Sequence, residues 1–218
     1  MNQRVKLIIE YDGTNYVGWQ NQCNQRSIQG EIEKSLKKVF NQTVVVYGAG
    51  RTDAGVHALK QVAHFDLERL EISEKKILHA LNFYLKKEKN QISILDSKIV
   101  KPTFHARFSV KNKTYLYKVF NRSTESFLIK NRSWFIPVDL NVEKMIQASK
   151  KLVGKFDFNA FRSSDCQAKN SVRSIEKIII RKKKDFINFE ISGRSFMHNQ
   201  VRIIVGTLIN IGKEILKI

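Results

Sequence analysis

The sequence is poor in the residues that would place it in several common protein classes. It has only two cysteines, Cys23 and Cys166, which lie far apart and form neither a C-x-x-C motif nor zinc-ligand spacing. Two reduced thiols are therefore expected, and a disulfide framework is excluded. The five histidines, at positions 57, 64, 79, 105 and 198, also lack metal-ligand spacing. No bound metal is expected.

Long hydrophobic runs are also missing. The first ten residues have no apolar stretch of the kind found in signal peptides. The most apolar run near the C-terminus, 201–211, contains Arg202 and is shorter than the ~20 residues that a membrane-spanning helix needs. We therefore expect a soluble protein of the cytoplasm with no membrane partner.

Acidic residues are scarce relative to basic ones. The chain has 20 Asp and Glu against 39 Lys and Arg, a formal net charge of +19. An excess of this size favours a polyanionic partner, with nucleic acid ahead of an anionic membrane surface. Part of it can also reflect a composition rich in Lys, Asn and Ile. Apolar residues make up 42% of the chain, which is typical of a globular protein and excludes a disordered one.

Hydrophobic periodicity predicts two halves of similar plan. We expect strands at 5–11, 43–47, 61–67, 92–100, 114–120, 172–181 and 186–192. We expect helices at 27–40, from Ser73, from Asn141 to a C-terminal Gly154, and at 196–211, with a loop at 156–165. No Pro- or Ser-rich linker separates the halves, which favours shared structure.

These elements predict an α+β fold. Its two similar α/β halves, 1–107 and 108–218, would have a joined, mostly antiparallel mixed sheet. The helices would lie on one side, and the halves would form a catalytic cleft between them.

The glycine-punctuated segment 48–57 is the strongest candidate for a functional site. It fails as a dinucleotide-binding fingerprint, because its third glycine comes two places late and a strand follows instead of a helix. It also fails as a Walker A loop, because Gly55 is followed by Val56 and His57 where the phosphate-binding lysine should stand. Both nucleotide-loop patterns are therefore excluded.

Two interpretations of this loop remain open from its composition. Glycines at positions 48, 50 and 55 permit positive φ angles and the close approach of a ligand, which suits an active-site loop presenting Arg51 and Asp53. The alternative is a tight turn in which Arg51 and Asp53 pair with each other at the surface.

The residues Gly50 to His57 match the G-R-T-D-A-G-V-H loop of the tRNA pseudouridine synthase A family in eight consecutive positions. Further segments resemble later blocks of the same family: Tyr11–Thr14, Gly18–Gln20, Ser27–Gly30, Gln61–Phe65, Lys113–Tyr117, Phe158–Arg162 with Cys166, Ser195–Phe196 and Val201–Arg202. The resemblance thus extends over nearly the whole chain.

The resemblance implies that Asp53 is the catalytic carboxylate of a uridine-to-pseudouridine isomerisation. The reaction breaks the N1–C1′ bond of uridine and joins C5 to C1′, with no redox change or net hydrolysis, so neither metal nor organic cofactor is required. The charge that develops at C1′ resembles that of glycoside chemistry, in which a carboxylate stabilises or captures the centre. Whether Asp53 acts as the nucleophile at C1′ or as a base at the ribose is left open.

The resemblance also implies a partner for Asp53 in Arg202 of the last helix. A lone carboxylate in a cleft needs a positive partner to stay ionised. Arg202 interrupts an apolar helix, where an unpaired charge would be costly. We therefore expect an ion pair between the two residues.

Three more residues correspond to substrate contacts. Tyr115 matches the family tyrosine that lies against the target uracil, as an aromatic face suits a flipped base, although Tyr117 lies on the same strand face. Arg51 matches an arginine that holds the nucleotide out of its stack. His57, beside the loop, is expected in a structural or RNA-contact role.

The family implies a homodimer that modifies positions 38 to 40 of the tRNA anticodon arm and reads RNA by shape and phosphate. A catalytically idle RNA-binding protein that keeps the basic cleft is the rival hypothesis. Family members usually continue past the last helix into a closing strand, whereas this sequence ends at Ile218. Whether the chain is a minimised or an incomplete enzyme, and whether it has full stability and activity, is left open.

Overall fold

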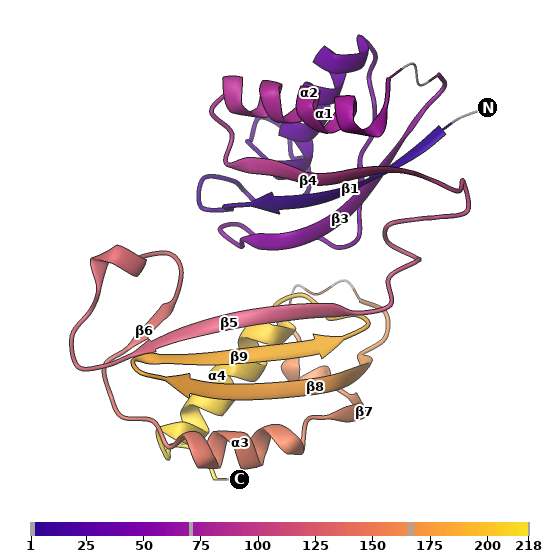
Figure 1. Ribbon diagram of the computed structural model, residues 1–218. Coiled ribbons are helices and arrows are strands. Elements are labelled where there is room, and N and C mark those ends of the chain that lie inside the picture. Colours follow the sequence, from indigo (N-terminus) through magenta and orange to yellow (C-terminus); the bar gives the residue numbers. More distant parts are fainter. Residues whose placement is uncertain (1–2, 70–71, 165, 167, 218) are drawn as a thin grey trace. The chain divides into compact units, whose positions relative to one another are not determined.

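The computed structural model describes residues 3–69, 72–164, 166 and 168–217. The chain divides into two compact units, with the boundary between Val110 and Lys111. Each unit has its own cluster of buried apolar side chains and is described by itself (Figure 1).

The first unit is a four-stranded antiparallel sheet with two helices on one face (Figure 1). Its sheet has the order β2-β3-β1-β4, so β1 and β3 are the inner strands. The elements in chain order are β1 (Gln3–Tyr11), α1 (Ile28–Phe40), β2 (Tyr47–Gly48), β3 (Ala58–Leu67), α2 (Glu74–Lys87) and β4 (Ile92–Val100). This βαββαβ order splits two strand–helix–strand units across one sheet.

Local sequence explains where the helices of the first unit begin. The side chains of Ser27 and Ser73 accept hydrogen bonds from the backbone N–H groups of Gly30 and Lys76, so both predicted N-caps are confirmed. The apolar stripe of α1 points into the core, where Ile32 and its neighbours have no exposed surface.

The predicted strand at 43–47 is wrong in extent, because only Tyr47 and Gly48 form a ladder. Val44 and Val46 are buried, yet the backbone N–H of Val46 donates to the Glu33 carboxylate at 3.0 Å. The alternation of β-branched residues predicted correctly which side chains are buried. It could not predict a strand, because a strand also needs a neighbouring backbone to pair with.

The second unit is a five-stranded mixed sheet, also with two α-helices on one face (Figure 1). Its order is β6-β5-β9-β8-β7, and only the short β5–β6 pair is parallel. The elements are β5 (Lys113–Asn121), η1 (Phe127–Ile129), β6 (Trp134–Ile136), α3 (Val142–Lys150), β7 (Gly154–Asp157), η2 (Asn159–Phe161), β8 (Val172–Lys183), β9 (Phe186–Gly193) and α4 (Gln200–Gly212). The predicted α+β class, mostly antiparallel pairing and one-sided helices are confirmed.

The described strands form two sheets, one in each unit, where a single joined sheet was expected. We expected a joined sheet because no Pro- or Ser-rich linker separates the halves. The composition of a linker indicates how flexible it is, but it does not specify which strands pair. After β4 the chain turns instead of pairing: the Arg4 guanidinium donates to the carbonyl oxygens of Pro102 and Phe104 at 2.7 and 2.6 Å. These contacts hold the connection against the first unit.

Three boundaries in the second unit also differ from expectation. Gly154 begins β7 with φ +134° and does not end α3, which stops at Lys150. The expected loop at 156–165 includes the end of β7 and the short helix η2. The last helix begins at Gln200, because the side chain of Gln200 accepts a hydrogen bond from the backbone N–H of Met197 and holds the preceding residues in a turn.

Candidate active-site loop and aromatic strand

The loop that carries Asp53 connects β2 to β3 and is anchored to neighbouring backbone. The N–H of Ala49 donates to the carbonyl of Val62 at 2.8 Å, and the Gln61 side chain donates to the carbonyl of Gly50 at 2.6 Å. These bonds hold the start of the loop on β3.

A second set of contacts holds the middle of the loop against the segment that follows β1. The backbone N–H of Trp19 donates to the carbonyl of Thr52 at 3.0 Å. The hydroxyl groups of Tyr11 and Thr52 share a hydrogen bond of 2.8 Å. Thr52 is therefore fixed through both its backbone and its side chain.

Asp53 lies directly after this fixed residue and is partly exposed, whereas Arg51 is exposed. The N–H of Val56 donates to the carbonyl of Asp53 at 3.2 Å, which closes a tight turn, and Gly55 completes it with φ +74°. The loop therefore contains a tight turn and also presents Asp53 from an anchored backbone, so the two interpretations of its sequence do not exclude each other. A partly buried acid on a rigid frame can act as a nucleophile or base.

His57 is fastened to the turn that follows β1. Its Nδ1 accepts a hydrogen bond from the backbone N–H of Gly13 at 3.1 Å and lies 3.0 Å from a carboxylate oxygen of Asp12. The neutral ring can accept from Gly13, and the protonated ring can donate to Asp12. These contacts give His57 a structural position, and its contact with substrate stays a prediction.

In the second unit, Tyr115 and Tyr117 lie on the same side of β5. The ring of Tyr115 meets Phe196 edge-on, with ring centres 5.2 Å apart. The ring of Tyr117 meets Trp134 in a similar way at 6.4 Å. Both tyrosines are half-buried, so the strand presents a row of aromatic faces.

Arg202 lies in the first turn of α4 and is exposed. The premise that this arginine would be buried in an apolar helix is therefore wrong, because position 202 falls on the open side of α4. The Arg202 guanidinium lies near the hydroxyl of Tyr117. Burial raises the pKa of Tyr117, and the Arg202 guanidinium opposes that rise. The only sequence signal for Tyr117 was its position on the same strand face as Tyr115.

The family model described as tRNA pseudouridine synthase matches residues 7–109 and 148–218, which include the Asp53 loop and Arg202. The chain belongs to the tRNA pseudouridine synthase family. It is 46% identical over 211 residues to "tRNA pseudouridine synthase A" of Anaplasma phagocytophilum (strain HZ), covering 96% of this chain and 85% of the relative.

Two further relatives of the same name give a consistent result. The chain is 46% identical over 214 residues to the protein of Wolbachia pipientis wMel, covering 97% of this chain and 85% of the relative. It is 42% identical over 210 residues to that of Sinorhizobium fredii (strain NBRC 101917 / NGR234), covering 96% and 85%. The suspected pseudouridine synthase family is thereby confirmed.

Within this pseudouridine synthase chain, the predicted site residues fall into two groups. Arg51, Asp53 and His57 come together in the first unit, on or beside one loop. Tyr115 and Arg202 belong to the second unit, on β5 and α4. Sequence reasoning did not assign any role to the hydroxyls of Tyr11 and Thr52, although both lie in segments that carry the family resemblance.

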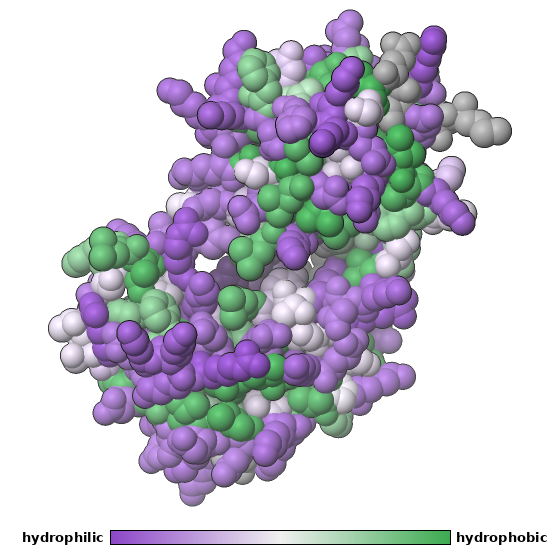
Figure 2. All heavy atoms as spheres, in the orientation of Figure 1, coloured by the Kyte–Doolittle hydropathy of each residue, from purple (hydrophilic) through white to green (hydrophobic). Residues whose placement is uncertain are grey.

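Positive charge is unevenly divided between the two units. Residues 1–110 contain 17 Lys and Arg against 11 Asp and Glu, whereas residues 111–218 contain 22 against 9. The basic run Arg181–Lys184 covers the last three residues of β8 and the first residue of the turn that leads to β9. Hydrophilic residues cover much of the face shown in Figure 2. The excess of basic residues suits the phosphate backbone of RNA.

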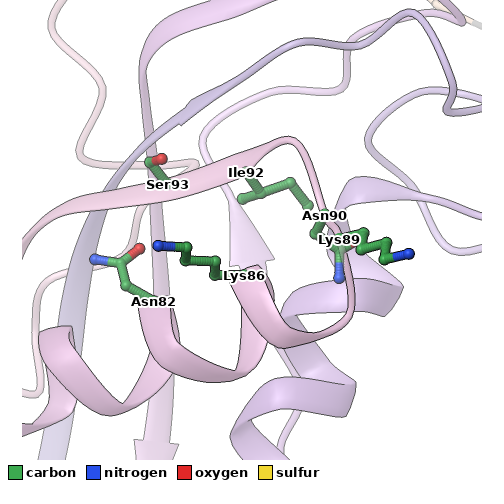
Figure 3. A pocket seen from close by; sticks show the side chains of 6 residues that line it. All are labelled: Asn82, Lys86, Lys89, Asn90, Ile92 and Ser93. Atoms are coloured by element: carbon green, nitrogen blue, oxygen red, sulfur yellow. The ribbon is translucent and has the colours of Figure 1, made fainter.

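Other features of the described residues add no competing site. Among them no group of His, Cys, Asp and Glu is arranged to hold a metal ion, and no helix is long and apolar enough to cross a membrane. A pocket beside α2 and β4 contains none of the predicted site residues (Figure 3); it is lined by Asn82, Lys86, Lys89, Asn90, Ile92 and Ser93. The Asn82 amide already bonds the backbone N–H and carbonyl of Ile94 at 2.8 Å.

Proposed function

We propose that this chain isomerises uridine to pseudouridine in the anticodon arm of tRNA, at positions 38 to 40, with Asp53 as the catalytic carboxylate. The observation that carries the proposal is the anchored loop, in which Asp53 lies between Thr52 and the turn closed by Val56. The family match over the same residues supports it, as do relatives named tRNA pseudouridine synthase A.

The chemistry needs one carboxylate and a way to hold the base. As the N1–C1′ bond breaks, its electron pair goes to the uracil and C1′ becomes electron-poor. Asp53 either attacks C1′ or removes a proton from the ribose. The uracil turns and C5 bonds to C1′, as the Asp53–C1′ bond breaks or the ribose proton returns. C5 then loses its proton and N1 takes one up, so the product is an isomer of uridine and every heavy atom of the nucleotide is retained.

The other predicted residues receive separate roles. Tyr115 offers a ring face for the flipped uracil, and its edge contact with Phe196 supports the ring. Arg202 supplies positive charge that favours an ionised carboxylate. Arg51, which is exposed, contacts the displaced nucleotide, and His57 contributes a contact beside the loop.

The same proposal covers partners and location. The excess of basic residues supports binding to RNA phosphates, with recognition mainly by helical shape. We further propose a homodimer acting in the cytoplasm, where a tRNA-modifying enzyme meets its substrate.

The rival is a catalytically idle RNA-binding protein, which the net charge of +19 alone would also support. Primer extension after carbodiimide treatment of incubated tRNA separates the two. We expect pseudouridine with the wild type and a loss on the order of 10³-fold or more with Asp53→Asn, as for other essential catalytic groups.

Asp96→Asn is the matched control, because Asp96 lies on β4 beside Lys98 and outside the loop. It should keep wild-type activity, and tRNA binding measured by filter retention should be similar in all three proteins. Bound but unmodified tRNA with the wild type would establish the idle binder instead.

A further inference from the structure

We propose that Tyr11 and Thr52 are positioning residues for Asp53, and that the hydrogen bond between their hydroxyl groups holds the catalytic loop in its reactive geometry. The inference rests on the proposed catalytic role of Asp53. Neither hydroxyl needs to touch the substrate, because Thr52 is bonded directly to Asp53 in the chain.

The first support is the number of ways in which Thr52 is held. Its hydroxyl bonds Tyr11 at 2.8 Å, and its carbonyl accepts from the N–H of Trp19 at 3.0 Å. The Thr52 carbonyl belongs to the peptide unit that enters Asp53, and that unit is planar. Fixing the carbonyl therefore limits the directions in which the Asp53 side chain can point.

The second support is the close approach of two backbones on either side of Asp53. A Cβ atom at Gly18 would overlap the carbonyl oxygen of Thr52, and a Cβ atom at Gly13 would overlap the carbonyl oxygen of Val56. Gly18 also has φ +112°, which other residues rarely adopt. The loop thus lies directly against the segment 13–19, with no room for a side chain between the two backbones at these points.

The third support is the rigidity of the group that delivers the hydroxyl. Tyr11 is the last residue of β1, an inner strand of the sheet, and its side chain is 3% exposed. Its backbone pairs with Ala58 on one side and Ile92 on the other. A buried tyrosine hydroxyl needs a hydrogen-bonding partner, and here that partner is on the catalytic loop.

Two variants remove the bond with little change in shape. Tyr11→Phe deletes one hydroxyl, and Thr52→Val replaces the other by a methyl group. We expect each to lower the single-turnover rate of pseudouridine formation roughly 10-fold, because small misplacements of catalytic groups cost about that or more. The affinity for tRNA should stay unchanged, and Thr52→Ser, which keeps the hydroxyl, should stay close to wild type.

The double variant Tyr11→Phe with Thr52→Val is the decisive measurement. If the two hydroxyls act only through their shared bond, the double variant should be no slower than the slower single variant. Rate losses that multiply would overturn the proposal, as would unchanged rates in proteins with lowered thermal stability.

Tyr16→Phe is the matched control. Tyr16 is also a buried tyrosine, 4% exposed, but its hydroxyl donates to Asn90 at 3.0 Å and accepts from the N–H of Gln91 at 3.0 Å. Its loss should lower stability without lowering the rate. A rate loss equal to that of Tyr11→Phe would point to general loosening and contradict the proposal.

Hydrogen exchange separates this inference from the proposed function. Amide exchange in the peptide spanning 50–56 should accelerate in Tyr11→Phe and not in Tyr16→Phe, whether or not the protein is active. An inactive wild type would refute the proposed function. An active wild type, with unchanged rate and exchange in Tyr11→Phe, would refute the positioning role alone.

Discussion

The two units follow one plan but differ in what they carry. Each has a sheet with two α-helices on one face, and in each the first α-helix begins at a side-chain N-cap, Ser27 or Asn141. In the first unit β1 is paired along both edges, by β3 and β4. In the second, β5 is paired with β9 along most of its length, but with β6 only at Val119–Asn121.

Although the two units have a similar fold, they differ in net charge and in the candidate catalytic residues that they carry. The first unit holds the anchored Asp53 loop and has 17 basic against 11 acidic residues, a net charge of +6, whereas the second has 22 against 9, a net charge of +13. A repeated fold therefore does not repeat function, since function lies in the loops and side chains placed on it. If the proposed function is correct, the first unit supplies the fixed carboxylate and the second supplies most of the charge that attracts phosphate.

The largest difference between the units should appear on acidification. His64 of the first unit is 1% exposed and stacks on Tyr47 at 5.1 Å. Burial, together with the charges of Arg4 and His105, lowers its pKa to about 4. The one histidine of the second unit, His198, is exposed.

Because the folded pKa of His64 lies below the unfolded value of about 6.5, its contribution is present above pH 6.5 and is lost as the pH falls toward 4. The full loss is ~3 kcal/mol, about 2 kcal/mol of it between pH 7 and 5. Urea denaturation can follow each unit through one tryptophan, using Trp134→Phe to isolate Trp19 and Trp19→Phe to isolate Trp134. His64→Asn should abolish the difference, and equal acid sensitivity of both units would contradict it.

A smaller contrast concerns one glycine from each unit. Gly18→Ala should lower the free energy of unfolding by roughly 1–3 kcal/mol, because its φ is +112° and its Cβ would overlap Thr52. Gly206→Ala should raise it by roughly 0.5–1 kcal/mol, since Gly206 lies inside α4 with open space around a Cβ. Urea denaturation measures both. An unchanged free energy of unfolding in Gly18→Ala would show that the loop and segment 13–19 can move apart at little cost.

The smallest expected effect tests the division of charge. Replacing Lys182, Lys183 and Lys184 by Gln should weaken tRNA binding several-fold, by about 1 kcal/mol, and flatten its dependence on salt. Replacing the exposed Lys86, Lys87 and Lys89 of the first unit should weaken it less. Filter binding at several salt concentrations compares the two variants. Equal losses would mean that the RNA responds to total charge and not to its location.

Sequence predicted the elements whose signals are local. Both serine N-caps and the strand at 92–100 were predicted correctly, because capping and alternation act over a few residues. The short strands β6 and β7 were not predicted, since three or four residues carry too little pattern to be distinguished from a loop. The predicted start of α4 was four residues early, because the Gln200 side chain accepts from the Met197 N–H and holds residues 197–200 in a turn before the helix.

By itself the sequence determined the α+β class, the family, and Asp53 as the candidate carboxylate, because each depends on neighbouring residues. Only the tertiary structure decided that the described strands form two sheets, that Arg202 is exposed and lies near Tyr117, and that Thr52 is held by Tyr11. Tyr11 and Thr52 are 41 positions apart, and no local pattern encodes a contact at that separation. It exists because the sheet brings the end of β1 beside the loop between β2 and β3.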